Sequence, residues 1–525
     1  MSGGAPNKEA KYDRQLRLWQ AHGQRALESA SILVVNANAT ATETLKNLVL
    51  PGIGAFTLLD AKKVDGADAG NNFFLGVDSL GRNRAESACL LLNELNADVN
   101  GAAVIDVRLA LDADWLSRFS LVVVANSDDP EITREIARVC WDKNIPFMSV
   151  RTYGFVGYLR IQAREHVVVE THPESILDLR LDCPFPELVA YADSFDLESL
   201  GNMEFAHVPY VVILLKCLQK WKETREKLPS TTAERNEFKA MVKALERSGV
   251  EDENFQEAQK SVFRACSATT VPGAVAAILQ EAKSLPMNAE TSSFWVLAAA
   301  VTRFVEEEGQ LPLAGVVPDM KADTESFVRL QTLYRDRAHR DAARVAILAA
   351  GLGVGVIVPG VEEVARFCKN VRHVQVVRTS SVESEYGSVV SGGTGWEKAG
   401  EVAQLSQDLD SPIAHYLLLR GVDAFYTQHK RYPGYHAQDV ESDIGLFKKT
   451  CTAMLTGLGL PVSALTDDLI HETVRAGASE LHTMASFMGG VCSQEIIKLI
   501  TGQYVPLNNT FVYNGVKSVG ASFYL

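Results

Sequence analysis

"SILVVNANATATETLKNLVLPGIGAFTLLD", residues 31–60, is expected to form a strand, a turn, a helix and a second strand. That order is typical of the first unit of a nucleotide-binding α/β fold. Such a unit carries G-x-G-x-x-G at its first turn, because glycines allow the tight turn and the approach of backbone to phosphate. Asn36, Asn38 and Ala41 stand at those positions here. The stretch keeps the strand–turn–helix–strand order and lacks the glycines. This favours a turn that binds no phosphate.

The same alternation continues to residue 162 and predicts an α/β domain with a mostly parallel sheet. The strands are continuously apolar, as in a sheet covered by helices on both faces. "GYLRIQAREHVVVETHP", residues 157–173, is expected to add two strands around a turn. The other expected strands are Ile32–Val35, Ala55–Leu59, Ala103–Val107, Leu121–Ala125 and Phe147–Val150, and the expected helices are Thr42–Leu50, Arg84–Leu95 and Ile132–Cys140.

The chain changes character twice, which predicts three segments. Residues 1–173 are expected to form the first part of the α/β domain, and residues 174–475 a large, mainly helical insertion built from amphipathic helices. Residues 476–525 contain a helix and two short strands, Thr510–Tyr513 and Ala521–Leu525. We expect this last segment to return to the opening sheet.

Composition excludes several classes of function. The formal net charge of −14 argues against binding to nucleic acid or to an anionic membrane, which requires a basic surface. The longest apolar run, residues 345–358, is shorter than the roughly 20 residues that span a bilayer. No cysteines form a C-x-x-C pair and no histidines show metal-ligand spacing, so we expect neither a structural metal nor disulfides. A cytoplasmic or nuclear protein is the resulting expectation.

Three stretches together carry a family resemblance: "KYDRQLRLW" (11–19), "TETLKNLVLPGIGAFTLLD" (42–60) and "ELHTMASFMGGVCSQEIIKLITGQYVPLNNT" (480–510). In combination they resemble the activating enzymes for ubiquitin and ubiquitin-like modifiers. The closest likeness, strengthened by "DAGNNFF" (68–74) and "KRYPG" (430–434), is to the regulatory, non-catalytic subunits of neddylation-activating enzymes, the APP-binding-protein type. The resemblance implies a Rossmann-like, ThiF/MoeB-like adenylation-type domain. It also implies that the helical insertion corresponds to a catalytic-cysteine domain without its cysteine.

The resemblance further implies an obligate heterodimer in which only the partner, the catalytic subunit, binds ATP and Mg and carries the thioester-forming cysteine. This chain would bind no cofactor of its own. The pair would adenylate the C-terminus of a Nedd/Rub-type modifier, transfer it to the partner's cysteine and pass it to a conjugating enzyme.

Compared with active members of that family, this chain has lost further groups besides the glycines. The family's Asp-x-Asp falls on Asp60 and Lys62, which puts a cation where a carboxylate is needed. Its Arg-Gln falls on Asn71 and Asn72, which removes a cation that would grip phosphate. Its catalytic lysine falls on Arg84, which keeps the charge and changes the geometry. The resemblance therefore implies a degenerate nucleotide site.

Arg14, in "KYDRQLRLW", is the candidate catalytic residue. In the family, the arginine of this motif reaches across the dimer interface to ATP bound by the partner, where it offsets phosphate charge during adenylation. Arg17 lies one turn further along and is a second candidate. On spacing alone, both residues are better explained as ordinary surface cations on one helix face. The family resemblance reverses this for Arg14 and not for Arg17.

Two other residues could suggest chemistry in this chain. Asp128 in "VVVANSDDP" matches the position of a metal-organising aspartate, yet the proline two residues later favours a helix cap. Cys183 in "LRLDCPFPELV" is expected in an exposed loop, but its context does not match the family's catalytic cysteine. We expect neither to be catalytic.

Residues 318–341 match a family region that contacts the catalytic partner. An apolar stripe on the helix expected there predicts an interface. A face packed on its own domain explains the stripe equally well. The predicted interface residues are Met320, Phe327, Leu330, Leu333 and Tyr334.

Three alternatives stay open. An autonomous nucleotide-dependent oxidoreductase or adenylyltransferase would need the missing glycines and a carboxylate in place of Lys62. A pure scaffold or adaptor would bind the partner and contribute nothing to catalysis. A regulatory subunit for a SUMO-type modifier is disfavoured by the long helical region.

Overall fold

The computed structural model describes residues 8–127, 129–173, 178–353, 355–386, 396–408 and 411–525. The chain divides into two compact units. Unit 1 contains residues 1–168 and 376–525, and unit 2 contains residues 169–375.

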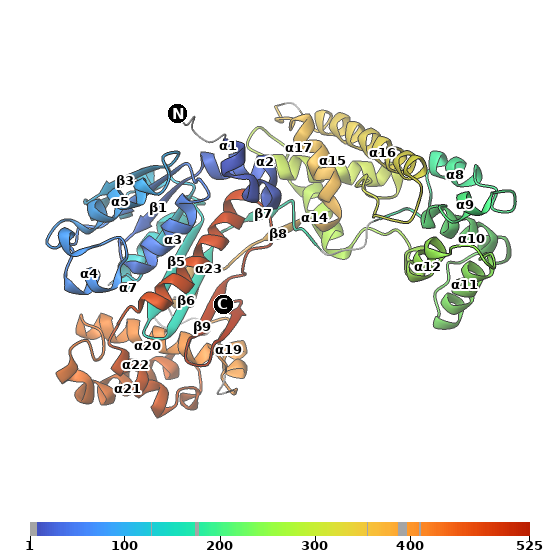
Figure 1. The fold of residues 1–525 in the computed structure, drawn as a ribbon. Helices are drawn as coiled ribbons and strands as arrows, with labels where there is room; N and C mark the ends of the chain where they lie inside the picture. The colour runs from blue at the N-terminus through green and yellow to red at the C-terminus, as the bar shows by residue number, and fades with distance from the viewer. Residues whose placement is uncertain (1–7, 128, 174–177, 354, 387–395, 409–410) are drawn as a thin grey trace. The chain divides into compact units, whose positions relative to one another are not determined.

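Unit 1 is built around an eight-stranded sheet with the order β10-β9-β6-β5-β4-β1-β2-β3 (Figure 1). Strands β3, β2, β1, β4 and β5 run parallel, whereas β6, β9 and β10 join antiparallel. The eight strands are β1 (Ser31–Val35), β2 (Ala55–Leu59), β3 (Asn100–Val104), β4 (Leu121–Ala125), β5 (Phe147–Tyr153), β6 (Val156–Gln162), β9 (Thr510–Asn514) and β10 (Val519–Phe523).

A second sheet has only two strands, β7 (His166–Val168) and β8 (Gln375–Val377). The two strands predicted within residues 157–173 are therefore present, but β6 pairs with β5 and β9 whereas β7 pairs with β8.

Helices cover both faces of the large sheet, as its continuously apolar strands predict. Along β1, Ile32 and Val34 face one core with α2, α3, α5 and α23, whereas Leu33 and Val35 face a second core with α7. The helices of unit 1 are α1 (Lys8–Lys11), α2 (Asp13–Ser29), α3 (Ala39–Val49), α4 (Gly66–Asn71), α5 (Arg84–Glu94), α6 (Ala113–Leu116), α7 (Pro130–Asp142), α18 (Val382–Tyr386), α19 (Ala399–Leu405), α20 (Ile413–His429), α21 (Val440–Gly457), α22 (Asp467–Ala476) and α23 (His482–Thr501).

The C-terminal segment returns to the opening sheet, as the sequence predicts. Helix α23 packs beside α3, and a Cβ added at Gly489 would lie only 2.8 Å from Cβ of Glu43 (Figure 1). Strand β9 then pairs with β6. The first and last parts of the chain therefore form one core.

Strand β3 lies three residues earlier than predicted. The prediction followed the apolar residues up to Val107, but Ile105 and Val107 are 56% and 53% exposed. Pairing with β2 fixes the strand instead, since Asn100 is aligned with Ala55 and Val104 with Leu59.

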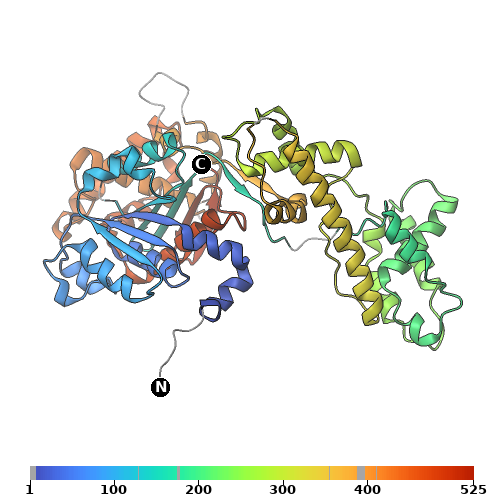
Figure 2. The same ribbon diagram turned by 90° about the horizontal axis from the view of Figure 1, so that it is seen from above.

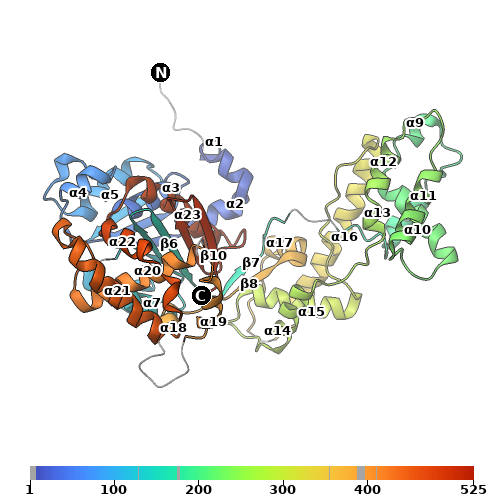
Figure 3. The ribbon, with the colours of Figure 1, turned by 90° about the horizontal axis from the view of Figure 1, so that it is seen from below.

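The predicted end of the insertion, residue 475, differs from the structure, because the chain re-enters unit 1 at Val376. Helices α20, α21 and α22 lie together next to β6 of the sheet (Figure 3). Their apolar residues share a core with Tyr153 of β5 and Val512 of β9. Helical periodicity alone could not reveal which core these helices join.

Unit 2 is helical, and its helices appear in green to yellow in Figure 2. Its main core gathers residues of α8, α10, α11, α12, α13 and α16. Its helices are α8 (Pro186–Asp193), α9 (Asn202–Phe205), α10 (Tyr210–Thr224), α11 (Thr232–Ala244), α12 (Glu253–Lys260), α13 (Val262–Ala265), α14 (Gly273–Ser284), α15 (Ser293–Glu308), α16 (Thr324–Ala350) and α17 (Val361–Asn370). Among the helices described in the two units, none has the length and apolar character needed to cross a membrane.

Candidate functional site

The turn between β1 and α3 is closed by asparagine side chains. Asn36 has φ of 72°, in the left-handed region that glycine would otherwise supply, and asparagine tolerates this region better than most residues. The Nδ2 atoms of Asn36 and Asn38 both donate to the carbonyl of Ala125, at 2.9 and 2.8 Å. Oδ1 of Asn38 also accepts from the N–H of Ala41 at 3.0 Å and caps α3. The turn survives without glycine because these amides hold it.

Asp60, the acidic residue retained after β2, is paired inside the chain. Its Oδ2 accepts from the backbone N–H of Ala37 at 2.8 Å and from Nε of Arg84 at 2.7 Å. Arg84 also lies 3.1 Å from the carboxylate of Asp68. The guanidinium of Arg84 is largely buried, and the charges of Asp60 and Asp68 outweigh that burial and raise its pKa. Arg84 therefore fixes the local structure and does not present its charge to a ligand.

The other predicted losses follow the same pattern. Asn72 is buried, and its Oδ1 accepts from Oγ1 of Thr42 and from the N–H of Phe74. Asn71 ends α4, next to it in the chain. Lys62 donates its backbone N–H to Oδ1 of Asp60 at 2.8 Å. Asn72 and the backbone of Lys62 are thus bound within the chain, and Nδ2 of Asn72 also donates to the carbonyl of Ala37 in the β1–α3 turn.

Glu480 lies at the N-terminus of α3, where a phosphate binds in intact folds of this type. Its Oε1 accepts from the N–H of Thr40 at 2.8 Å, from Oγ1 of Thr40 at 2.5 Å and from Nδ2 of Asn126 at 2.8 Å. Its Oε2 accepts from the N–H of Ala39 at 3.1 Å. We call the N–H groups of Ala39 and Thr40 the anion position of α3. The structure places a carboxylate of the chain in that position.

Sequence reasoning missed Glu480. It precedes α23 and contacts Thr40 across 440 residues of chain, so no local pattern indicates the contact. A pocket of about 140 Å³ lies beside it, lined by Asn38, Lys62, Arg84, Asn126, Ser127, Arg151, Thr152, Tyr153, Tyr432, Ala478 and Glu480. Two cations of this lining are paired within the chain, Arg84 with Asp60 and Arg151 with Asp423, both at 2.6 Å.

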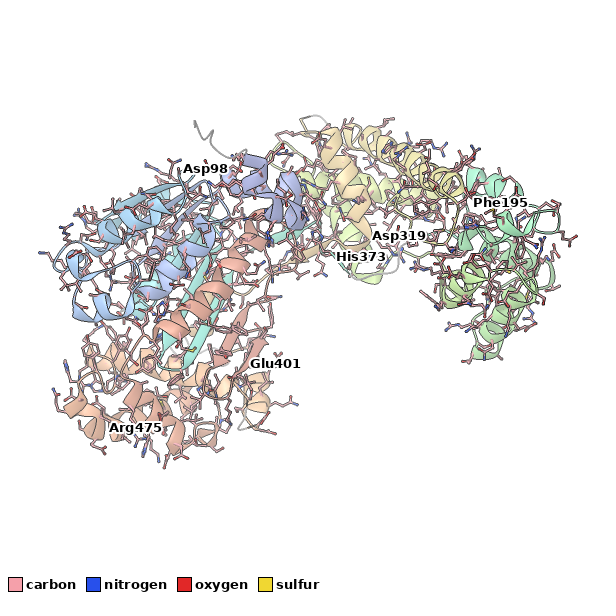
Figure 4. All side chains as sticks on the ribbon, in the orientation of Figure 1. Asp98, Phe195, Asp319, His373, Glu401 and Arg475 are labelled. Atoms are coloured by element: carbon pink, nitrogen blue, oxygen red, sulfur yellow. The ribbon has the colours of Figure 1, made fainter. Side chains whose placement is uncertain are left out.

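Helix α2 presents Arg14 to solvent because other residues of its motif are anchored. The hydroxyl of buried Tyr12 donates to Asp98 at 2.9 Å and accepts from Asn96 at 3.0 Å. Asp98 is labelled in Figure 4. A Cβ at Gly52 would lie 2.7 Å from that hydroxyl oxygen, so the turn after α3 requires glycine there. Seven residues later, buried Trp19 donates to Oε1 of Gln24 at 3.0 Å.

The two arginines of the motif differ in their surroundings. Arg17 forms an exposed ion pair with Asp13, at 3.0 Å. Arg14 is exposed and makes no hydrogen bond or ion pair with the residues that the structure describes. Of the two, Arg14 is the cation available to a ligand outside the chain.

The predicted interface residues on and just before α16 pack on the core of unit 2, and this corrects the prediction for the two that are fully buried, Leu330 and Tyr334. Leu330 and Tyr334 are fully buried, and the Tyr334 hydroxyl donates to the carbonyl of Leu179 at 2.6 Å. The other three residues, Met320, Phe327 and Leu333, are half-buried against the same core. The alternative of a face packed on its own domain accounts for Leu330 and Tyr334.

Cys183 does not have the surroundings of a nucleophile. Its side chain is exposed, while partial desolvation and the neighbouring Asp182 carboxylate raise the pKa of its thiol. A reactive thiol needs the opposite shift. Asp128 lies outside the described residues. In the part of the chain that is described, no group of three His, Cys, Asp or Glu side chains is arranged to hold a metal.

Comparisons with known proteins agree with the architecture. The ThiF family matches residues 12–521. A NEDD8-activating enzyme E1 regulatory subunit from Gallus gallus is 44% identical over 100% of this chain and 99% of that protein. The proteins of the same name from Danio rerio and Drosophila melanogaster are 42% and 36% identical, over 100% and 98% of this chain and 100% and 98% of their own lengths.

Proposed function

The chain belongs to the ThiF family and, within it, to the regulatory subunits of NEDD8-activating enzyme E1, and from this premise we propose that it is the non-catalytic half of such an enzyme. It binds a catalytic subunit that holds ATP and Mg and carries the thioester-forming cysteine. The pair adenylates the C-terminus of a Nedd/Rub-type modifier and passes it on to a conjugating enzyme. The free cysteines suit a reducing compartment, the cytoplasm or nucleus.

The observation that carries this proposal is the carboxylate of Glu480 at the anion position of α3. ATP brings several negative charges to that position in an active adenylation domain, and a second anion there would be repelled. The Asp60–Arg84 pair supports the same reading, because it neutralises the acid that an active site would use.

Arg14 gives this half a contribution to catalysis. Its side chain is exposed, while buried Tyr12 and Trp19 hold the helix that carries it in place. An arginine in such a position stabilises phosphate charge that develops during adenylation on the partner. A pure scaffold is the second candidate, and the Glu480 carboxylate at the anion position of α3 is compatible with it.

ATP–pyrophosphate exchange tests the proposal. The isolated chain should show no exchange with modifier present, while the reconstituted pair should show full exchange. A pair whose partner carries an inactivating change in its own ATP site should show none. Exchange by the isolated chain, or by that impaired pair, would overturn the proposal.

A further inference from the structure

We propose that Glu480 makes an autoinhibitory contact, in which its carboxylate takes the place of a nucleotide phosphate at the anion position of α3. The N–H donors of that position are retained, and the carboxylate blocks them. The inference rests on the proposed non-catalytic role and explains how the chain enforces it.

The donors of an anion-binding turn are still present. The N–H groups of Ala39 and Thr40 belong to the first turn of α3, where backbone N–H groups have no partner within the helix. Both point at the carboxylate, at 3.1 and 2.8 Å. The Asn126 side chain adds a donor from the end of β4, and its Oδ1 is held in place by accepting from the N–H of Thr152 at 2.7 Å. Donors from separate elements thus converge on one negative group.

Electrostatics favour a negative group at this point. The N-terminus of an 11-residue helix carries partial positive charge. Lys62, Arg84 and Arg151 line the adjacent pocket. Arg84 is balanced by Asp60 and Asp68, and Arg151 by Asp423 at 2.6 Å, so Glu480 supplies the negative charge nearest the helix end. Without it, a small tetrahedral anion such as inorganic phosphate would meet unsatisfied donors.

The segment that carries Glu480 is itself held in place. Residues 477–481 connect α22 to α23. Within them, the carbonyl of Ser479 accepts from the N–H of Gly154 at 2.8 Å, and Glu480 forms an isolated bridge with Gly154. The β5–β6 turn therefore fixes the backbone that presents the carboxylate. A free anion would have to displace a group that is already positioned.

Phosphate titration of the full chain tests the inference. Wild type, Glu480→Ala, Glu480→Ser, Glu480→Gln and the control Glu472→Ala are melted in rising inorganic phosphate, with ionic strength held constant by chloride. Glu472 lies on α22 with an exposed side chain, so the control removes one negative charge from the same region. We expect Glu480→Ala to melt below wild type and to regain about 2 °C in Tm, saturably, as phosphate at about ten times its Kd fills the vacated position.

Wild type and Glu472→Ala should show no saturable response to phosphate. If Glu480→Ala does not fold, Glu480→Ser carries the comparison, since its short side chain also vacates the position. Glu480→Gln removes the charge but keeps an oxygen that accepts from the N–H groups of Ala39 and Thr40, so it should respond less than the short variant. A phosphate response of the folded short variant equal to that of wild type would overturn the inference. That failure would leave the exchange assays of the pair untouched, and loss of those assays would leave the phosphate response untouched.

Discussion

Nη2 of Arg84 lies 2.6 Å from Oδ2 of Asp60, and these side chains are only 10% and 2% exposed. By the family resemblance, Asp60 is expected at the retained acid of the Asp-x-Asp and Arg84 at the position of the lysine. In this chain the two side chains form a buried ion pair that holds the local structure.

Arg84→Met should destabilise unit 1, because it leaves Asp60 buried without its cation. Breaking a buried pair by removing one partner costs about 3–5 kcal/mol. Urea denaturation followed by tryptophan fluorescence measures the loss. Arg82→Met, two residues away and exposed, is the matched control and should stay within about 0.5 kcal/mol of wild type. Equal stability of the two variants would show that the pair contributes nothing.

His166 should make the protein sensitive to mild acid. Burial lowers the pKa of its imidazole to about 4, and its Nε2 is buried without a hydrogen-bond partner among the residues that the structure describes. In the unfolded chain the imidazole binds a proton below about pH 6.5, whereas in the folded chain it does so only below about pH 4. The free energy of unfolding is therefore unaffected by His166 above pH 6.5 and falls as the pH drops from about 6.5 towards 4. The loss at pH 5 is about 2 kcal/mol.

The variant His166→Gln isolates this effect, since its side chain does not titrate. Denaturation midpoints at pH 7.5 and pH 5 should differ less for the variant than for wild type. An identical difference for both proteins would contradict the assignment to His166.

Leu330→Ala distinguishes a side chain of α16 that packs in the core of unit 2 from one that contacts the catalytic subunit. As a core change it should cost about 2–5 kcal/mol of unit 2 stability, because it leaves a cavity. Val328→Ala, on the same helix with a side chain that is 50% exposed, should cost far less. If Leu330→Ala kept full stability and only weakened binding to the catalytic subunit, the placement of Leu330 in the core would be wrong.

Local patterns predicted the parts of the fold that depend on local physics. Strands β2 and β4 have the predicted bounds, since continuous apolar runs flanked by turn residues define them. The limit of the insertion at residue 375 could not be predicted in this way, because amphipathic helices on either side of it look alike in sequence.

The features of the site that could not be predicted from the sequence depend on contacts between residues far apart in the chain. The lost glycines indicate that a phosphate site is degenerate, but they do not indicate what fills it. Glu480 reaches Thr40 from the far end of the chain, and Leu330 faces its own core although its periodicity fits an interface equally well. Both outcomes depend on which surfaces meet in the folded chain, and periodicity carries no information about that.

The rate of modifier adenylation by the reconstituted pair, measured as ATP–pyrophosphate exchange with Arg14→Ala, tests the central claim most directly. Loss of a charge-assisted contact worth about 1.5–3 kcal/mol should slow exchange about 10- to 100-fold. Arg17→Ala, which removes the arginine already paired with Asp13, is the matched control and should keep a rate near wild type. Full exchange by a stably assembled Arg14→Ala pair would contradict the account and leave this chain a scaffold.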